Sequence, residues 1–325
     1  MDIRFLSDAG VEQYPVEDLK GLLGRGDGLV WVDIPTCDEE ATRILSEVFE
    51  FHPLAVRDCS ERNTVPKVHL YSDHVFVVLH SPAEGSAGHV HFIELDQFIG
   101  PGYLVTVHGP INPAVDPSVA LVQTEKVLRS VESGRLRPSS SFELSFAIVS
   151  KLTGRLREYL AALTKDVWRL EQRVTAGHVG DPEEFLEELF RSRHGLLAVR
   201  TMAAHSREVY GRMAKLGVFG EAQSLLDDTV DQFTRIGTMA DGQREYLQGV
   251  IEFYQTRTHT KMTIAAERLA VIAAVTLPVT AVSSVIGMNV IVNDRTQPGL
   301  LLAALTLMSI MSVMLLIWAK RKGWW

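Results

Sequence analysis

Two long apolar segments occupy the last fifth of the chain. Residues 269–293 carry no charged side chain, and residues 299–319 are again uncharged before the basic residues at 320–322. Because about 20 apolar residues in a helix span the hydrocarbon core of a bilayer, the pattern predicts two membrane helices, at 269–290 and 299–319, joined by an external loop at 291–298. A buried hairpin in a soluble core is the alternative, but core helices are rarely so long and so free of charge.

The basic residues around these segments predict their orientation. Arg257, Lys261 and Arg268 precede the first segment and a basic tail at 320–325 follows the second, whereas the loop carries one acid and one base. Cytoplasmic flanks of membrane helices are enriched in Lys and Arg. We therefore expect a multi-pass protein of the inner (plasma) membrane with both termini in the cytoplasm.

The first segment differs from the second in carrying a polar stripe. Small and hydroxyl-bearing residues recur there at helical spacing: Thr276, Thr280, Ser283, Ser284 and Gly287. Such a stripe faces a pore or another helix, or its hydroxyls bond back to carbonyls of their own helix. Pro278 has no N–H and leaves the carbonyl of Ala274 without its usual donor, which favours a pore. A single hairpin cannot enclose a pore, so a channel needs several copies of the chain.

The N-terminal third has the pattern of an α/β domain. Runs rich in β-branched and aromatic residues at 29–35, 74–80, 89–100 and 103–109 predict buried strands. Asp38 precedes a helix-forming stretch and predicts an N-cap. We expect an α/β cytoplasmic domain with a mixed sheet over residues 1–135.

Long helical patterns follow this domain. Residues 141–174 form one amphipathic pattern, and Asp181 with Pro182 opens a second, so we expect long antiparallel helices over 136–220. A third pattern starts at Glu221 and meets no proline before Pro278. A stalk helix at 221–268 is therefore expected to continue directly into the first membrane segment. Long helices that lead into a membrane suggest a stalk that transmits motion.

Composition narrows the class of function. The net charge of −8 argues against nucleic acid as a partner, because phosphate binding needs a basic surface. Two cysteines, Cys37 and Cys59, are too few for a disulfide framework. His89 and His91 share a strand face and could bind zinc, but without a third ligand a surface pair is the favoured interpretation. The sequence has no glycine-rich phosphate loop and no hydrolase nucleophile motif, so we expect neither an enzyme nor a site for a small organic substrate.

A tripeptide at the end of the first membrane segment carries a family resemblance. Gly287, Met288 and Asn289 form a GMN motif after a proline-containing span and before a short loop, a second span and a basic tail. Upstream, HPLAVRD at 52–58, PKVHLYSDHVFVVLH at 66–80 and DQFIGPGYLVTVH at 96–108 follow in matching order and spacing. In these motifs the chain resembles the CorA family of magnesium transporters. The resemblance implies a homopentameric channel with an αβα cytoplasmic domain, a funnel of stalk helices and a pore lined by the first span.

The resemblance and elementary ion chemistry together suggest the pore residues. The expected selectivity filter and pore lining comprise Gly287, Met288, Asn289, Thr280 and Ser284. Mg²⁺ prefers oxygen ligands and gives up its water reluctantly, so a ring of Asn289 amides and backbone carbonyls near Gly287 would bind the water shell of the ion. Leu277 and Leu269 would form apolar constrictions that gate by dewetting, or else pack against other helices.

Acidic residues of the stalk pattern suggest a regulatory site. Asp241, Glu245 and Glu252 share one helical face, which by itself is typical of a solvated surface. The resemblance implies more, because Glu252, counted back from the GMN motif, falls where the family has a carboxylate in a metal site between subunits. Asp228 falls near a second such site. Mg²⁺ is therefore expected both as the transported ion and as a regulatory ligand that holds the stalks together when the cell is replete.

Two departures from the family pattern leave the transported ion open. Ile286 stands where the family usually has an aromatic residue, and in the loop the single acid, Asp294, is followed by Arg295. We expect Mg²⁺, with Co²⁺ and Ni²⁺ as further candidates. Zn²⁺ is the alternative, because the zinc-transporting branch of the superfamily has the same architecture. A membrane-anchored sensor or scaffold without transport is the second alternative, against which the polar stripe and Asn289 count.

Overall fold

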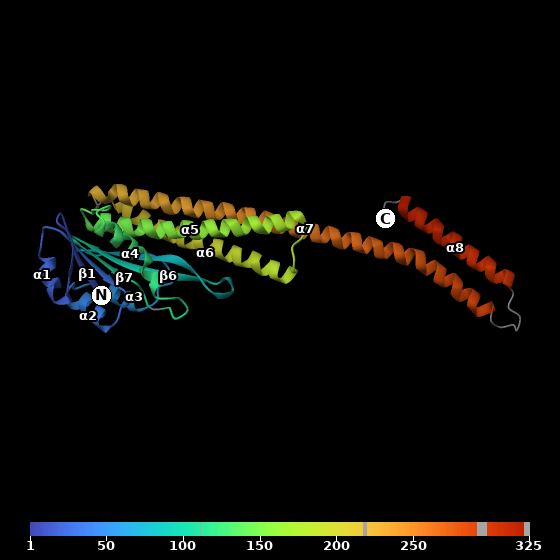
Figure 1. Ribbon diagram of the computed structural model, residues 1–325, viewed down its shortest axis with the longest axis horizontal. Helices are drawn as coiled ribbons and strands as arrows, with labels where there is room; N and C mark the ends of the chain where they lie inside the picture. Colours follow the sequence, from blue (N-terminus) through green and yellow to red (C-terminus); the bar gives the residue numbers. More distant parts are fainter. Residues whose placement is uncertain (111, 217–219, 291–297, 322–325) are drawn as a thin grey trace. The chain divides into compact units, whose positions relative to one another are not determined.

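The chain folds into two compact units, Met1–Val250 and Ile251–Trp325. The computed structural model describes residues 1–325 except 111, 217–219, 291–297 and 322–325 (Figure 1). The first unit holds a β-sheet with helices on both faces, and the second holds the apolar segments. One helix, α7 (Gln223–Val290), contributes residues to both units.

A seven-stranded mixed sheet forms the centre of the first unit. Its strands are β1 (Asp2–Ser7), β2 (Gly10–Tyr14), β3 (Leu29–Ile34), β4 (Lys67–Leu70), β5 (Val75–Glu84), β6 (Val90–Gly100) and β7 (Tyr103–Val107). They lie in the order β2-β1-β3-β7-β6-β5-β4. The β3–β7 pair is parallel and the other neighbouring pairs are antiparallel. The predicted mixed sheet and its four predicted strands are thus confirmed.

Three short helices cover one face of the sheet: α1 (Leu19–Leu23), α2 (Glu39–Glu47) and α3 (Pro53–Ser60). The main apolar core lies beneath them, where the ring of Phe51 stacks on that of Phe98 with centroids 4.0 Å apart. The predicted cap of α2 is confirmed, because Asp38 Oδ1 accepts a hydrogen bond from the backbone N–H of Ala41 at 2.8 Å. Such a cap satisfies one of the N–H groups that a helix start leaves unpaired.

Longer helices cover the opposite face: α4 (Ser118–Glu132), α5 (Ser141–Ala176) and α6 (Pro182–Leu216) (Figure 1). The guanidinium of Arg155 on α5 donates to the carbonyls of Pro82 and Val119, which ties α5 to β5 and α4. The unit is therefore an αβα sandwich, as expected. α5 and α6 begin near Ser141 and Pro182, as predicted. Gly177 ends α5 in the left-handed conformation at φ 81°.

The strands β1, β2 and β4 and the helix α1 were not predicted from the sequence. β2 and β4 are the edges of the sheet, and their side chains are exposed or half-buried. An edge strand of four or five residues shows little alternation, because neither of its faces is fully buried.

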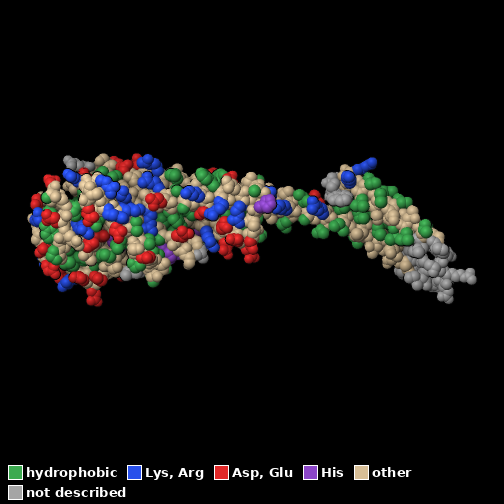
Figure 2. All heavy atoms as spheres, in the orientation of Figure 1, with side chains coloured by type: hydrophobic (Ala, Val, Ile, Leu, Met, Phe, Trp, Pro, Cys, Tyr) green, Lys and Arg blue, Asp and Glu red, His purple; other side chains and the backbone are tan. Residues whose placement is uncertain are grey.

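The last two helices carry the apolar segments. α7 is one helix of 68 residues that continues through Pro278, which confirms the predicted run from stalk to span. α8 (Pro298–Arg321) follows it. Both contain a segment long and apolar enough to cross a membrane, and only 6% of each apolar window is buried within the chain. Figure 2 shows charged side chains spread over the first unit and mainly apolar ones over the end of α7 and over α8.

A pair of acids lies inside the first unit on β6. Glu94 and Asp96 are two residues apart in the strand and so share a face, with exposures of 7% and 0%. Asn63 donates to both carboxylate oxygens of Glu94 through its backbone and side-chain N–H groups. Burial, and then the nearby charge of Glu94, raise the pKa of Asp96 well above its usual range. Burial inside the first unit therefore favours the protonated form of Asp96 relative to an exposed carboxyl.

The raised pKa of Asp96 predicts a pH dependence of stability. A group whose pKa is raised by folding stabilises the protein most below its unfolded pKa, and this stabilisation is lost as the pH rises through the folded pKa. Asp96→Asn keeps the shape and cannot ionise. We expect the melting temperature of the variant in detergent to gain on wild type progressively as the pH rises above about 4, the ordinary pKa of an aspartate.

The matched control for this experiment is Asp8→Asn, which changes an exposed carboxyl of a turn. Its melting curve should follow that of wild type at every pH. If Asp96→Asn and wild type keep a constant difference in melting temperature across the range, Asp96 does not titrate as its burial requires.

Candidate functional site

The polar stripe lies on an exposed face of α7. Its five members, Thr276, Thr280, Ser283, Ser284 and Gly287, are all exposed within the chain. At about 100° per residue they fall within a sector of about 100°. The hydroxyl of Thr276 donates to the carbonyl of Ile272, and that of Thr280 donates to the carbonyl of Thr276, each at 2.8 Å. The back-bonding interpretation thus holds for the two protons, while the oxygen lone pairs on the same face stay available as acceptors.

The two leucines expected to gate a pore are strongly exposed. Leu269 is 66% exposed and Leu277 is 68% exposed. Eight residues of helix turn through about 800°, which leaves the two side chains about 80° apart. Leu269 falls within the angular range of the polar stripe, and Leu277 lies beside it. Leu269 is therefore better placed than Leu277 to face the same direction as the hydroxyls.

The GMN motif ends α7. Gly287 is exposed and helical, and with no Cβ it leaves its backbone open, because a Cβ at this position would meet no atom within 4 Å. Met288 and Asn289 belong to the last turn of the helix, and their side chains lie outside the described residues. Asp294 of the loop also lies outside the described residues.

The acids of the stalk occupy different environments. The carboxylate of Asp228 accepts from the amide of Gln232 at 2.7 Å, and the oxygen of that amide accepts from Thr153 on α5. Asp241 pairs with Arg200 on α6 at 2.6 Å. Asp241 thus joins α7 to α6 through an ion pair. The other two acids of the predicted face, Glu245 and Glu252, are exposed.

A second exposed stripe on α7 was not predicted from the sequence. Met239 and Tyr246 are 57% and 42% exposed at a spacing of seven residues, and Phe253, 52% exposed, continues the spacing. Gly242 and Gly249 stand between them, and a Cβ at either glycine would meet nothing within 4 Å. We call this set the large–small stripe. A seven-residue repeat is the signature of packing against another helix, and that repeat is the signal the sequence offered.

Another face of α7, about 110° round the helix from the large–small stripe, is already buried in its own unit. Phe233, Ile236, Ala240 and Leu247 are each at most 1% exposed. Their spacing of three, four and seven residues is that of a helix packed along its length on other helices. α7 therefore has two apolar faces, one of which packs within the chain while the other is exposed.

The histidine pair gains a neighbour in the structure. The rings of His89 and His91 have centroids 4.8 Å apart, and His194 of α6 lies 6.3 Å from His89. Across the described residues no group of three or more His, Cys, Asp or Glu side chains is arranged to hold a metal ion. The surface interpretation of the pair remains the favoured one.

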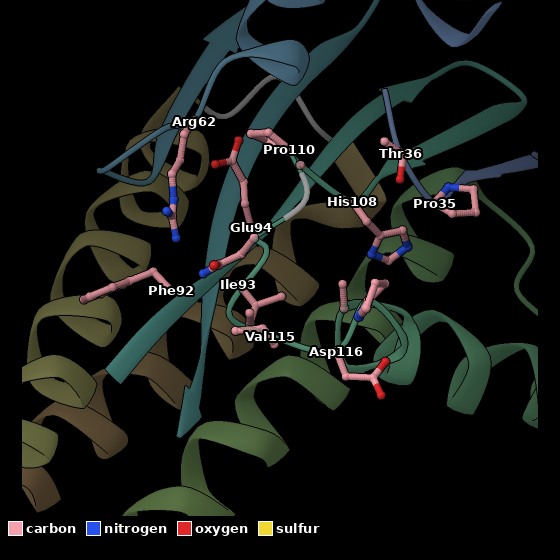
Figure 3. A pocket seen from close by; sticks show the side chains of 14 residues that line it. Pro35, Thr36, Arg62, Phe92, Ile93, Glu94, His108, Pro110, Val115 and Asp116 are labelled. Carbon is pink, nitrogen blue, oxygen red and sulfur yellow. The ribbon is translucent and has the colours of Figure 1, made fainter. Parts of the chain in front are cut away.

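A small pocket lies beside the end of β7 (Figure 3). Its volume is about 50 Å³, enough for a few water molecules and far below the several hundred Å³ of typical organic-ligand pockets. His108 in its wall contacts Asp33 at 2.9 Å. Burial acts to raise the pKa of Asp33, but the charge and hydrogen bond of His108, with a bond from Thr106, outweigh it and hold that pKa below its usual range. The pair joins β7 to β3, which is a structural task.

These features define a class of protein: an αβα domain joined by a continuous helix to two apolar helices of membrane-spanning length and composition. The sequence model of the family described as "CorA-like Mg2+ transporter protein" matches residues 26–321, and the chain belongs to this family. It is accordingly a membrane protein of metal ion transport and not an enzyme.

Curated relatives agree with this assignment. The putative metal ion transporter YfjQ of Bacillus subtilis is 24% identical over 302 residues, which cover 90% of this chain and 89% of the relative. The cobalt/magnesium transport protein CorA of Thermotoga maritima is 21% identical over 305 residues, covering 90% of this chain and 83% of the relative.

Solved structures share the fold. The complete CorA magnesium transporter of Methanocaldococcus jannaschii superposes with a TM-score of 0.81 at 16% identity, covering 100% of this chain and 99% of that chain. The ZntB cytoplasmic domain of Vibrio parahaemolyticus gives a TM-score of 0.60 at 10% identity over 80% of this chain and 98% of that domain. The resemblance deduced from the motifs is thereby confirmed for fold and family.

Proposed function

We propose that the protein is a homopentameric channel that passes hydrated Mg²⁺ through the inner membrane along a pore lined by α7. The observation that carries this proposal is the exposed polar stripe on an otherwise apolar helix. Thr276 and Thr280 donate to carbonyls of their own helix, but in lipid their remaining oxygen lone pairs would meet no donor. Such a face is therefore expected to line a pore or to meet another helix. The names of two similar proteins support the ion: the cobalt/magnesium transport protein of Thermotoga maritima and the magnesium transporter of Methanocaldococcus jannaschii.

Several copies are needed because one hairpin encloses nothing. The large–small stripe supports an assembly in which α7 helices of neighbouring copies approach closely, with the large side chains of one helix set against the glycines of the next. The number five comes from the family resemblance. The positive flanks at Arg257, Lys261, Arg268 and the tail support a cytoplasmic location for both termini.

The filter is assigned to the outer end of the pore. Five Asn289 amides would accept hydrogen bonds from the first water shell of the ion, and the exposed backbone at Gly287 would add carbonyl oxygens. Below them, Thr280 and Ser284 would offer hydroxyl oxygens, and Leu269 with Leu277 would form the apolar constriction. An ion that keeps its water avoids the large cost of stripping Mg²⁺.

Regulation is assigned to carboxylates of the stalk. Asp228 and Glu252 are exposed on α7, so each is accessible to a neighbouring copy. Mg²⁺ bound between facing acids would cancel their repulsion and hold the stalks together, and loss of the ion would let them separate. The channel would then close when cytoplasmic Mg²⁺ is abundant.

Assembly is the first test. We expect native mass spectrometry of the purified protein in detergent to give a pentamer. The double variant Gly242→Leu/Gly249→Leu should shift the distribution toward smaller species, because leucine fits the open space in the chain but blocks the approach of a second helix. Gly211→Leu on α6, where a Cβ also meets nothing within 4 Å, is the matched control. A monomer in the wild type would overturn the channel.

Regulation is tested with Asp228→Asn/Glu252→Gln. Mg²⁺ should protect the wild-type stalk from protease, and the variant should lose that protection and need more Mg²⁺ for inhibition of flux. The control is Asp231→Asn on the same helix, an exposed acid outside the proposed sites. If the double variant keeps both the protection and the inhibition, the acids are solvated surface charges.

The filter is tested by Mg²⁺ flux into proteoliposomes. Asn289→Ala removes every acceptor of the proposed ring, and flux should fall by at least about tenfold with assembly unchanged, since one lost hydrogen bond per subunit to a charged group is worth about 1.5–3 kcal/mol. Ser309→Ala in α8 should transport like wild type. Wild-type flux in Asn289→Ala would show that the filter lies elsewhere.

A matched threonine pair sharpens the same test. Thr280→Val removes the hydroxyl and keeps the side-chain shape, so flux should fall. Thr306 in α8 makes the same back-bond, to the carbonyl of Leu302 at 2.7 Å, and Thr306→Val should have little effect. Competition by Zn²⁺, Co²⁺ and Ni²⁺ in the same liposomes separates a magnesium channel from a zinc transporter of the same fold.

A further inference from the structure

A stripe of basic side chains lies on α7 directly before its apolar segment. Arg257, Lys261 and Arg268 are spaced by four and seven residues, and at about 100° per residue they fall within a sector of about 40°. Lys261 and Arg268 are exposed, and Arg257 is half-buried. We call these three residues the basic stripe. Lys320 and Arg321, both exposed, end α8 with further positive charge.

The basic stripe starts at the level of the lipid headgroups and extends beyond them along α7. Arg268 is the last charged residue before the apolar segment. With a rise of about 1.5 Å per residue, Lys261 lies about 10 Å and Arg257 about 16 Å further from the hydrocarbon. The headgroup layer is about 5–7 Å thick, and charges act over about 8 Å beyond it at physiological salt. The long side chains therefore bring all three charges within reach of the lipid phosphates.

The direction of the stripe also fits a lipid partner. Measured round the helix, its centre is about 100° from the centre of the polar stripe, so it does not line a pore that the polar stripe faces. Glu252 lies about 160° round from it and Glu267 about 100°. Neither acid lies on the helix face of Lys261 and Arg268, and these two exposed side chains give that face a positive charge that suits a negative partner.

We propose that the basic stripe binds the phosphate groups of anionic phospholipids in the leaflet next to the αβα domain. The ligand class is a phosphodiester monoanion held at the membrane surface, to which arginine donates two parallel hydrogen bonds and lysine a single strong one. The contact sets the depth at which α7 enters the bilayer. The proposal rests on the membrane insertion in the proposed function and is independent of which ion is transported.

The test measures lipid selectivity of the full chain in liposomes. Spin-labelled phosphatidylglycerol and phosphatidylcholine report, by electron paramagnetic resonance, the fraction of lipid held at the protein. Wild type should prefer phosphatidylglycerol. In Arg257→Gln/Lys261→Gln the preference should fall about fivefold for each charge lost near the surface at low salt, and high salt should reduce it in wild type.

The matched control removes two positive charges far from the membrane segments. Arg157→Gln/Lys165→Gln changes two exposed basic residues of α5 and should keep the wild-type preference. Equal preference in wild type and Arg257→Gln/Lys261→Gln, or an equal loss in the control, would overturn the proposal. Loss of the preference on adding millimolar inorganic phosphate would also overturn it, because the stripe would then be a site for free phosphate.

Failure of this proposal is distinguishable from failure of the channel. Mg²⁺ flux is measured in the same liposomes with phosphatidylcholine alone and with added phosphatidylglycerol. Flux without any lipid preference rejects the lipid site and leaves the channel standing. A preference for phosphatidylglycerol without Mg²⁺ flux in any liposome rejects the channel and leaves the lipid site standing.

Discussion

A chain that enters hydrocarbon has to satisfy every backbone N–H and C=O within itself, and the architecture of this protein follows from that constraint. α7 meets it as one helix of 68 residues that starts in the αβα unit and includes the first apolar segment. Pro278 removes one N–H from the ladder at the depth of the segment. The polar stripe lies on the other side of the helix from Pro278, and its threonines donate to the carbonyls of Ile272 and Thr276.

The first half of α7 is held in place by the αβα unit. Phe233 and Ile236 are fully buried against the unit, and polar bonds add direction: Thr153 donates to Gln232, and Arg200 pairs with Asp241. Both partners of the ion pair are nearly half exposed, so the pair itself is worth little free energy. Its role is to fix the rotation of α7, and with it the direction of the exposed stripes.

The αβα unit provides a rigid base through buried polar pairs as well as through its apolar core. Asp33 with His108 joins β3 to β7, and the carboxylate of Glu94 accepts two hydrogen bonds from Asn63 in the loop. Replacing one member of such a pair leaves a buried polar group without a partner, which costs more than the pair gains. The unit is therefore held in a single arrangement, which the proposed regulation through the stalk would require.

The sequence by itself determined the long elements, the membrane segments and the family. The sequence signals for these features are local, because each depends only on residues close together in the chain. They are the continuous apolar runs, caps such as Asp38 and Asp181, and the GMN motif at 287–289. Only the tertiary structure decided what depends on distant residues. The edge strands β2 and β4, the pairing of Asp241 with Arg200, the raised pKa of Asp96 and the second apolar face of α7 belong to this group. Each depends on which side chains lie opposite in space, and a spacing along one helix or strand fixes the face of a residue but not its partner.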